Sequence, residues 1–308
     1  MFQKWVEKAL VEGKEKEIEV RKDAFWQRRC RIIGRVGLEL TAKENFDEII
    51  KKPCIFCMPE KLAKFGNEFG SEMFENEHAF LFPNINPYAR YSSVCAFKKH
   101  YIKLEEFKAE IIEKNLELCI EYIKKVMELD DIKYASINWN YLMPAGASIL
   151  HPHTQVVADE HSTTYMEKVA ENGEQFREYI KKEMESERFI GEIGNISLFT
   201  PFVPFGFNEV VGIVSNKLFS SINEIAQALE AIISYYESIG RNSFNVCIYA
   251  SLNDEFSLHF RCITRQNMAK YYRNDAMFFE RLHSEVILEK KPEEVAKEIK
   301  EYLEKRSK

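Results

Sequence analysis

The chain has 308 residues, of which 45% are hydrophobic and 30% charged, and its formal net charge at pH 7 is −6. This composition is typical of a soluble globular protein and excludes a disordered or fibrous chain, and the negative charge argues against a protein that binds nucleic acid through phosphate contacts. No apolar run approaches the roughly 20 residues of a membrane span, no signal-peptide core stands at the N-terminus, and seven scattered cysteines argue against a disulfide framework. We therefore expect a cytoplasmic protein.

The first residues of the chain have a helical pattern. Their apolar side chains recur at helical spacing, at Phe2, Trp5, Val6, Ala9 and Leu10. We predict an N-terminal helix and assign residues 1–17 to it.

A strand-like pattern follows, from Ile18 to about Leu40. This segment holds a basic cluster of Arg21, Lys22, Arg28, Arg29, Arg31 and Arg35. Such a cluster can meet phosphates, but it is also common as plain charge on an exposed sheet face.

Two cysteines lie three residues apart between prolines, in Pro53-Cys54-Ile55-Phe56-Cys57-Met58-Pro59. Two thiolates at this spacing can bind one ion. Alone, the motif is ambiguous between a zinc site, redox chemistry and chance. The proline that follows Cys57 fits the redox interpretation poorly, because a redox pair prefers the N-terminus of a helix.

The rest of the first half reads as strands, one long helix and two more strands. We predict strands over 79–84 and 92–97, a helix over 104–129 and a strand over 134–140. His100 follows the second of these strands. This order is typical of an α+β unit.

A glycine-containing turn then leads to two histidines. The small residues Ala145-Gly146-Ala147-Ser148 precede His151-Pro152-His153, and a β-branched run follows. Histidine is one of the few side chains that can be a nucleophile, a base or a metal ligand near neutral pH. Two histidines can also be ordinary polar residues on a sheet, so the motif alone leaves both interpretations open.

The second half repeats the element order of the first. A surface helix over 163–186 leads to a β-rich segment over 189–214, a helix over 222–239, strands over 244–249 and 257–263, and a closing helix over 292–306. We predict an α+β fold of two duplicated units, over 18–162 and 163–308, with long helices packed on antiparallel sheets. His259 and Arg261 then take the place of the His-Pro-His strand in the second unit.

These motifs together resemble the galactose-1-phosphate uridylyltransferase family, the nucleotidyltransferase branch of the histidine triad superfamily. The resemblance rests on Gly146-Ala147-Ser148-x-x-His151-Pro152-His153-x-Gln155, on Cys54-x-x-Cys57 and on His100, with support from Phe82-Pro83-Asn84 and Arg21-Lys22-Asp23. It is firm over about 18–158 and looser beyond, and it implies that the two units are histidine-triad-like.

The resemblance implies a chemical role for two residues of the motif. His153 would attack the α-phosphorus of a nucleoside diphosphate sugar and carry the nucleotide as a covalent intermediate, with the carbonyl of His151 orienting its ring. Hydrolases of the superfamily carry a third histidine where this chain has Gln155. A neutral amide suffices for a sugar phosphate leaving group, so glutamine favours transfer over hydrolysis.

The resemblance also implies ligand and metal contacts. Gly146 and Ser148 would bind phosphate oxygens, and Asn84 and Asn140 match positions near the nucleotide. The remaining set, Cys54, Cys57, His100 and His151, would hold one structural zinc ion in a closed Cys₂His₂ site.

The sequence departs from the family pattern in three places. Arg35 stands where the family often has Arg-x-x-Arg-Pro, and we expect it to help hold the nucleotide. His259-x-Arg261 replaces a His-x-His strand, so we expect no second metal. Glu280 loosely matches a glutamate that holds sugar hydroxyls.

The predicted function is exchange of a nucleoside monophosphate between a nucleoside diphosphate hexose and a hexose 1-phosphate. UDP-glucose and galactose 1-phosphate are the leading pair, and the resemblance suggests a homodimer with no nucleic-acid or membrane partner. One alternative is a phosphorylase that uses inorganic phosphate as acceptor. Another is a non-catalytic, zinc-stabilised protein that binds nucleotides.

Overall fold

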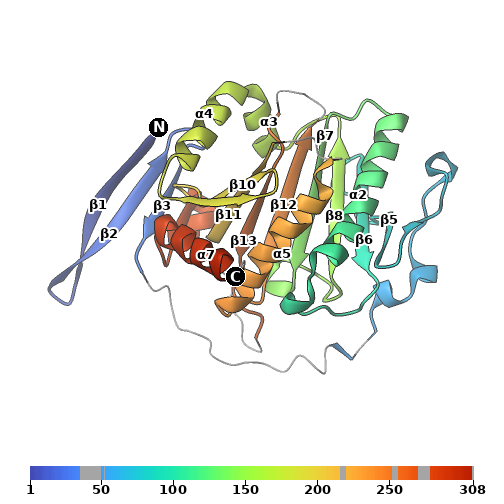
Figure 1. Cartoon of the computed structure of the whole chain (residues 1–308), viewed down its shortest axis with the longest axis horizontal. Helices are drawn as coiled ribbons and strands as arrows, with labels where there is room; N and C mark the ends of the chain where they lie inside the picture. Colours follow the sequence, from blue (N-terminus) through green and yellow to red (C-terminus); the bar gives the residue numbers. More distant parts are fainter. Residues whose placement is uncertain (35–49, 52, 216–219, 252–255, 270–277, 307–308) are drawn as a thin grey trace.

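A long antiparallel sheet runs through the molecule. The computed structural model describes residues 1–34, 50–51, 53–215, 220–251, 256–269 and 278–306, and within these the strands form one sheet of ten and one of four (Figure 1). The order of the large sheet is β4-β5-β6-β8-β7-β12-β13-β11-β10-β9. Its strands are β4 Phe74–Glu75, β5 Ala79–Pro83, β6 Tyr91–Phe97, β7 Tyr134–Tyr141, β8 His153–Asp159, β9 Phe189–Ile193, β10 Ile196–Phe199, β11 Phe207–Val214, β12 Phe244–Ser251 and β13 His259–Thr264.

The large sheet confirms the duplicated α+β arrangement. Read outward from its centre, one half has the order β7, β8, β6, β5 and the other β12, β13, β11, β10. Helix α2 (Ala109–Leu129) connects the two hairpins of the first half, and α5 (Ile222–Ser238) connects those of the second. The two halves join edge to edge where β7 pairs with β12. The unit boundaries at residues 162 and 163 stay a prediction.

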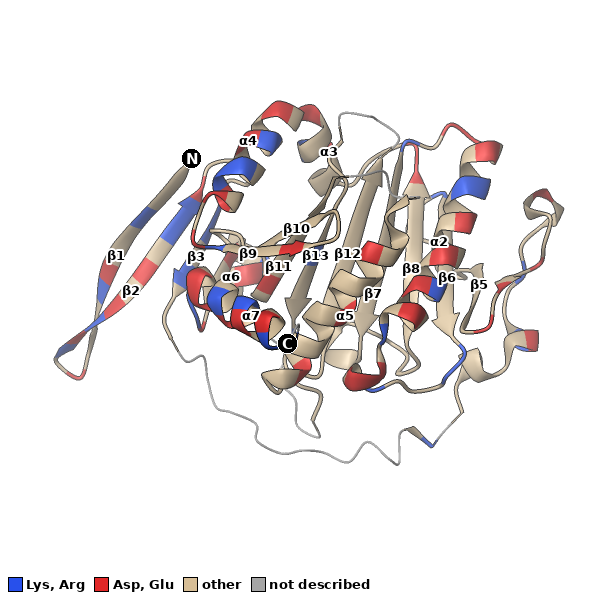
Figure 2. Ribbon diagram, in the orientation of Figure 1, with Lys and Arg blue, Asp and Glu red and all other residues tan. Residues whose placement is uncertain are grey.

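Helices α2 and α5 pack against each other on one face of the sheet (Figure 1). The chain of α2 contains no glycine or proline, and its side chains at Ile112, Leu116, Ile123 and Val126 form one buried stripe. Figure 2 shows charged residues along α2, while the ribbons of β7, β8 and β12 are almost entirely tan. None of the helices in the described residues is both long and apolar enough to cross a membrane.

The opposite face of the sheet is covered differently in the two halves. Over the second half lie α3 (Thr164–Glu171) and α4 (Gly173–Met184), which form an apolar cluster with Trp26, Phe199 and Val211. The break at Asn172 divides the helix predicted over 163–186 into these two. The alternation of each strand sends side chains to this face at every second position, and on β7 they are Ser136, Asn138 and Asn140.

The predicted N-terminal helix is wrong. Residues Phe2–Val11 form strand β1, which pairs over its whole length with β2 (Lys14–Asp23). Glu12 and Gly13, both with positive φ, make the two-residue turn that suits such a hairpin. The apolar residues of this segment are spaced as in a helix, but pairing with β2 across the turn stabilises the strand more than that spacing stabilises a helix.

The small sheet joins the two ends of the chain. Its order is β1-β2-β3-β14, with β3 at Arg28–Ile32 and β14 at Glu285–Leu288. Strand β14 pairs parallel with β3, and the next segment is helix α7 (Pro292–Arg306), which packs on α5, β9 and β11. The short helix α6 (Phe278–His283) precedes β14.

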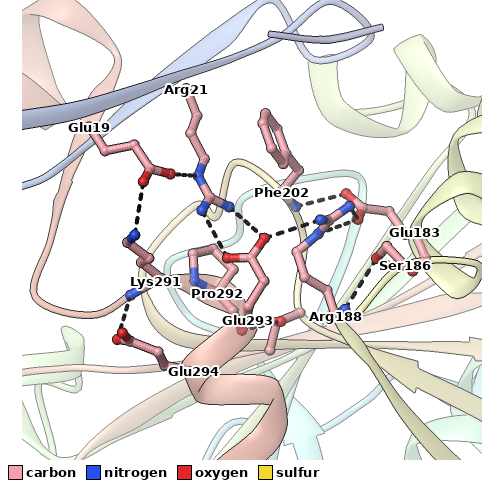
Figure 3. Close-up of polar contacts among 11 residues, drawn as sticks. Glu19, Arg21, Glu183, Ser186, Arg188, Phe202, Lys291, Pro292, Glu293 and Glu294 are labelled. Atoms are coloured by element: carbon pink, nitrogen blue, oxygen red, sulfur yellow. Dashed lines mark hydrogen bonds and ion pairs between the residues drawn. The ribbon is translucent and has the colours of Figure 1, made fainter. Parts of the chain in front are cut away.

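A buried ionic network fixes the small sheet to the body (Figure 3). Arg21 of β2, 2% exposed, donates from both terminal nitrogens to the carboxylate of Glu293 at 2.8–2.9 Å and from Nε to Glu19. Arg188 donates to Glu293 at 3.2 Å and to Glu183. Glu183 also accepts from the amide of Phe202. Part of the basic cluster seen in the sequence is thus used in internal ion pairs.

Glu293 gives this network a pH dependence. Burial alone would raise the pKa of Glu293, but the hydrogen bonds and charge of Arg21 and the charge of Arg188 lower the pKa to about 2. The ionised Glu293 therefore contributes its stabilisation fully above its unfolded pKa of about 4.5, and this contribution is lost as the pH falls towards 2.

We expect Glu293→Gln to lower the free energy of unfolding by about 3 kcal/mol at pH 7. The difference from wild type should shrink steadily below pH 4.5, measured by urea denaturation from pH 3 to 7. Glu301→Gln, in an exposed pair on the same helix, is the control and should be near neutral. An equal cost of Glu293→Gln at pH 3 and pH 7 would contradict this assignment.

Candidate active site and metal centre

The predicted metal ligands lie together at one end of the first half. Cys54 and Cys57 belong to a short 3-10 turn (Ile55–Cys57) that is closed by the amide of Cys57 donating to the carbonyl of Cys54. His100 follows β6 and His151 precedes β8. Their four ligand atoms, two Sγ and two Nδ1, all lie within 4.8 Å of one another.

The spacing of these atoms matches a tetrahedral zinc site. The two Sγ atoms are 3.8 Å apart, the two Nδ1 atoms 3.3 Å, and the four S–N distances run from 3.0 to 3.8 Å. A tetrahedron with Zn–S of about 2.3 Å and Zn–N of about 2.0–2.1 Å has edges of about 3.8, 3.3 and 3.6 Å respectively. Burial raises the pKa of the Cys54 thiol, as does the neighbouring Cys57, so a bound cation would favour the thiolate form of Cys54.

His151 is held in the orientation that such an ion requires. Its Nε2–H donates to the carbonyl of Phe97 at 2.5 Å, which leaves the lone pair of Nδ1 directed at the two sulfurs. Burial lowers the pKa of His151 to about 4, so the ring is neutral and able to bind a metal.

His153 has the opposite tautomer. Its Nδ1 donates to the backbone carbonyl of His151 at 2.8 Å, as the resemblance implied, and the lone pair is therefore on Nε2. Burial lowers the pKa of His153, which favours the neutral ring. The ring of Phe56, between the two cysteines, packs edge-on against His153 with centroids 5.2 Å apart. The turn that carries Cys54 and Cys57 therefore also packs against the ring of His153.

Gln155 lies on the same face of β8 as His153. Its Oε1 accepts a hydrogen bond of 3.4 Å from Nδ2 of Asn84, which follows β5. This contact directs Oε1 towards Asn84 and leaves the Nε2 amide as the donor that faces away from it. On the neighbouring strand β7, Asn138 lies directly opposite Gln155, and Asn140 is two residues further on the same face.

The glycine turn leads from β7 to the metal ligand. After the 3-10 turn Met143–Ala145, Gly146 adopts φ +90°, a conformation that favours glycine. Gly146 and Ser148 are exposed, so their backbone and hydroxyl groups can reach a ligand. The structure thus brings Asn84, Asn140, Gly146, His153 and Gln155 to one face of the first half.

Among the described residues predicted for the site, Glu280 is not on this face. Arg35 is outside the described residues. Glu280, on α6, lines a small cavity with Arg265, Phe207 and Val286, and its role with a sugar stays a prediction.

Sequence reasoning missed Asn245 of β12 and Arg265, which follows β13. Asn245 donates to the side chain of Asn140 and to the backbone of the glycine turn, and Arg265 donates to Asn245. The available signal was the duplication, which places β12 beside β7.

The second half contains a buried counterpart of His153 at His259. Nδ1 of His259 contacts the carbonyl of Ser257 at 2.7 Å, which is the same i−2 contact that His153 makes. Its Nε2 contacts the hydroxyl of Tyr165 at 2.8 Å. Arg261, in the position of Gln155, is buried in an ion pair with Glu209.

Comparison with known proteins places the chain in a family. It is 32% identical, over 97% of its own length and 98% of the other chain, to an uncharacterized protein of Archaeoglobus fulgidus. The chain belongs to the family of this archaeal protein. No protein-family model matches the chain.

Solved structures show which known fold the chain has. The chain aligns over 92% of its length with an ADP-glucose phosphorylase from Arabidopsis thaliana with bound ADP-glucose, at 17% identity and a TM-score of 0.67, covering 98% of that chain. It aligns over 93% of its length with a uridylyltransferase, at 18% identity and a TM-score of 0.63, also covering 98%. The fold is that of the galactose-1-phosphate uridylyltransferases, and the resemblance drawn from the motifs is confirmed as to fold.

For the metal centre, we expect about one zinc ion per chain in freshly purified protein, measured by elemental analysis. Cys57→Ser should lose most of the metal and lower the melting temperature, because one thiolate ligand is gone. Cys247→Ser, which lies outside the cluster, should keep the metal. Freshly purified wild type that holds no metal, and whose melting temperature does not change on addition of a chelator, would contradict the assignment.

Proposed function

We propose that the protein transfers a nucleoside monophosphate from a nucleoside diphosphate sugar through a covalent intermediate on His153. The observation that carries the proposal is the hydrogen bond from Nδ1 of His153 to the carbonyl of His151, which leaves Nε2 as a nucleophile. Two structural neighbours, a uridylyltransferase and an ADP-glucose phosphorylase with bound ADP-glucose, support the same class of reaction.

The reaction has two in-line steps. First, Nε2 of His153 attacks the α-phosphorus, an N–P bond forms, and the bond from this phosphorus to the bridging oxygen breaks, releasing a hexose 1-phosphate. Second, a phosphate oxygen of the acceptor attacks the same phosphorus, the N–P bond breaks, and Nε2 regains its lone pair. No proton has to be supplied to the phosphate leaving group, so the chain needs no strong general acid.

The neighbouring polar groups bind and orient the substrate. The Nε2 amide of Gln155 donates to a non-bridging phosphate oxygen as negative charge moves in the transition state. Gly146 and Ser148 take the other phosphate oxygens, and Asn84 keeps the amide of Gln155 turned towards the substrate. Cys54, Cys57, His100 and His151 would hold a zinc ion, which would supply structure because the chain would fill all four of its ligand positions.

We expect wild-type protein to become labelled with radioactive phosphorus from α-labelled UDP-glucose or ADP-glucose. The label should be acid-labile and base-stable, as a phosphoramidate is, and His153→Gly should take up none because the attacking nitrogen is absent. His161→Ala, at an exposed site, should be labelled like wild type. The absence of label from both sugar nucleotides would favour the non-catalytic alternative.

The acceptor is tested by what removes the label. We expect galactose 1-phosphate to release it as a nucleoside diphosphate sugar, with inorganic phosphate at least about tenfold slower at equal concentration. The reason is that a hexose 1-phosphate can also use sugar contacts such as those proposed for Glu280. Faster release by inorganic phosphate, with a nucleoside diphosphate as product, would instead identify a phosphorylase.

A further inference from the structure

A line of hydrogen bonds runs from the second half of the chain into the glycine turn of the first. Nη1 of Arg265 donates to Oδ1 of Asn245 at 2.9 Å. Nδ2 of Asn245 then donates to Oδ1 of Asn140 at 2.7 Å and to the carbonyl of Ala145 at 2.8 Å. The line crosses the seam where β12 pairs with β7, with Asn245 directly opposite Asn140.

The guanidinium group gives this line a fixed direction. Arginine only donates hydrogen bonds, so the oxygen of Asn245 must face Arg265 and its NH₂ group must face the other way. Both hydrogens of that NH₂ group are then used, one on Asn140 and one on Ala145. Because the oxygen of Asn140 is the acceptor, its own NH₂ group points away from Asn245.

The NH₂ group of Asn140 points towards the glycine turn. Its Nδ2 lies 3.8 Å from the place that a Cβ would take on Gly146, nearer than any other atom outside the turn itself. Within the part of the chain that the structure describes, no protein acceptor is recorded for this group. It is therefore available to a ligand bound against the turn.

We infer that Arg265 and Asn245 are positioning residues that hold Asn140 as a donor towards an acceptor oxygen, phosphate or ribose, of the nucleotide. This inference rests on the proposed function, in which Gly146 receives the phosphates. With the amide of Asn140 reversed, its oxygen would face an oxygen of the ligand, and a favourable contact would become a repulsive one. The second half thereby sets the hydrogen-bond polarity of the site in the first.

Asn245→Asp tests the direction of the line. The carboxylate still accepts from Arg265, but it has no hydrogen to donate. Asn140 then turns its NH₂ group towards Asp at position 245 and presents its oxygen to the ligand. We expect the KM for the sugar nucleotide in the labelling assay to rise about tenfold or more, with metal content and melting temperature close to wild type.

A double-mutant cycle separates orientation from general damage. In an Asn140→Ala background, Asn245→Asp should raise the KM less than about twofold further, because the group whose orientation it controls is gone. Arg265→Lys, which keeps a partner that only donates, should stay near the wild-type KM. An equal effect of Asn245→Asp in both backgrounds would overturn the inference, since it would then act through the turn or the fold.

Equilibrium binding keeps this test independent of catalysis. Wild type, Asn245→Asp, Asn140→Ala and the double variant are titrated with UMP and AMP by calorimetry, which needs no covalent step. If wild type is not labelled but binds a nucleotide, the proposed function fails and the cycle is evaluated on Kd. If wild type binds neither nucleotide and takes up no label, the inference fails as well.

Discussion

The backbone between two histidines is the constraint on which the site depends. The ring of His151 faces the two cysteines, and its carbonyl accepts the hydrogen bond from Nδ1 of His153. A ligand set that holds the ring of His151 therefore also holds the carbonyl that fixes the tautomer of His153. Pro152 between them restricts the backbone further, so the position of His151 among the possible metal ligands and the orientation of the His153 ring depend on each other.

The strands and long helices were predictable because their signals are local, whereas the set of four possible metal ligands was expected from the family resemblance. The stripe of α2 and the alternation of β7 follow from one segment each, and the Cys54–Cys57 spacing implies a turn. The carbonyl contact of His153 was expected from the family resemblance alone. The N-terminal segment shows the limit, since its apolar spacing fits a helix and only pairing with β2 makes it a strand.

Contacts between distant segments could not be predicted in the same way. Arg21 looked like surface charge, yet its partner Glu293 is 272 residues away and becomes a neighbour only because β14 pairs with β3. Asn245 and Arg265 carry no motif at all. Their importance comes from the edge-to-edge joining of the two halves, which a single sequence shows only as repeated element order.

The two halves place a histidine in the same backbone geometry but in different surroundings. His153 and His259 each contact a carbonyl two residues earlier, but Nε2 of His259 meets the hydroxyl of Tyr165, and aromatic side chains beneath α3 and α4 bury it. On this face of the sheet, the second half is covered by α3 and α4. Asn245 lies on that same face of the sheet, one strand from Asn140. Through the hydrogen bonds of Asn245 to Asn140 and to the glycine turn, the second half therefore acts directly on the first.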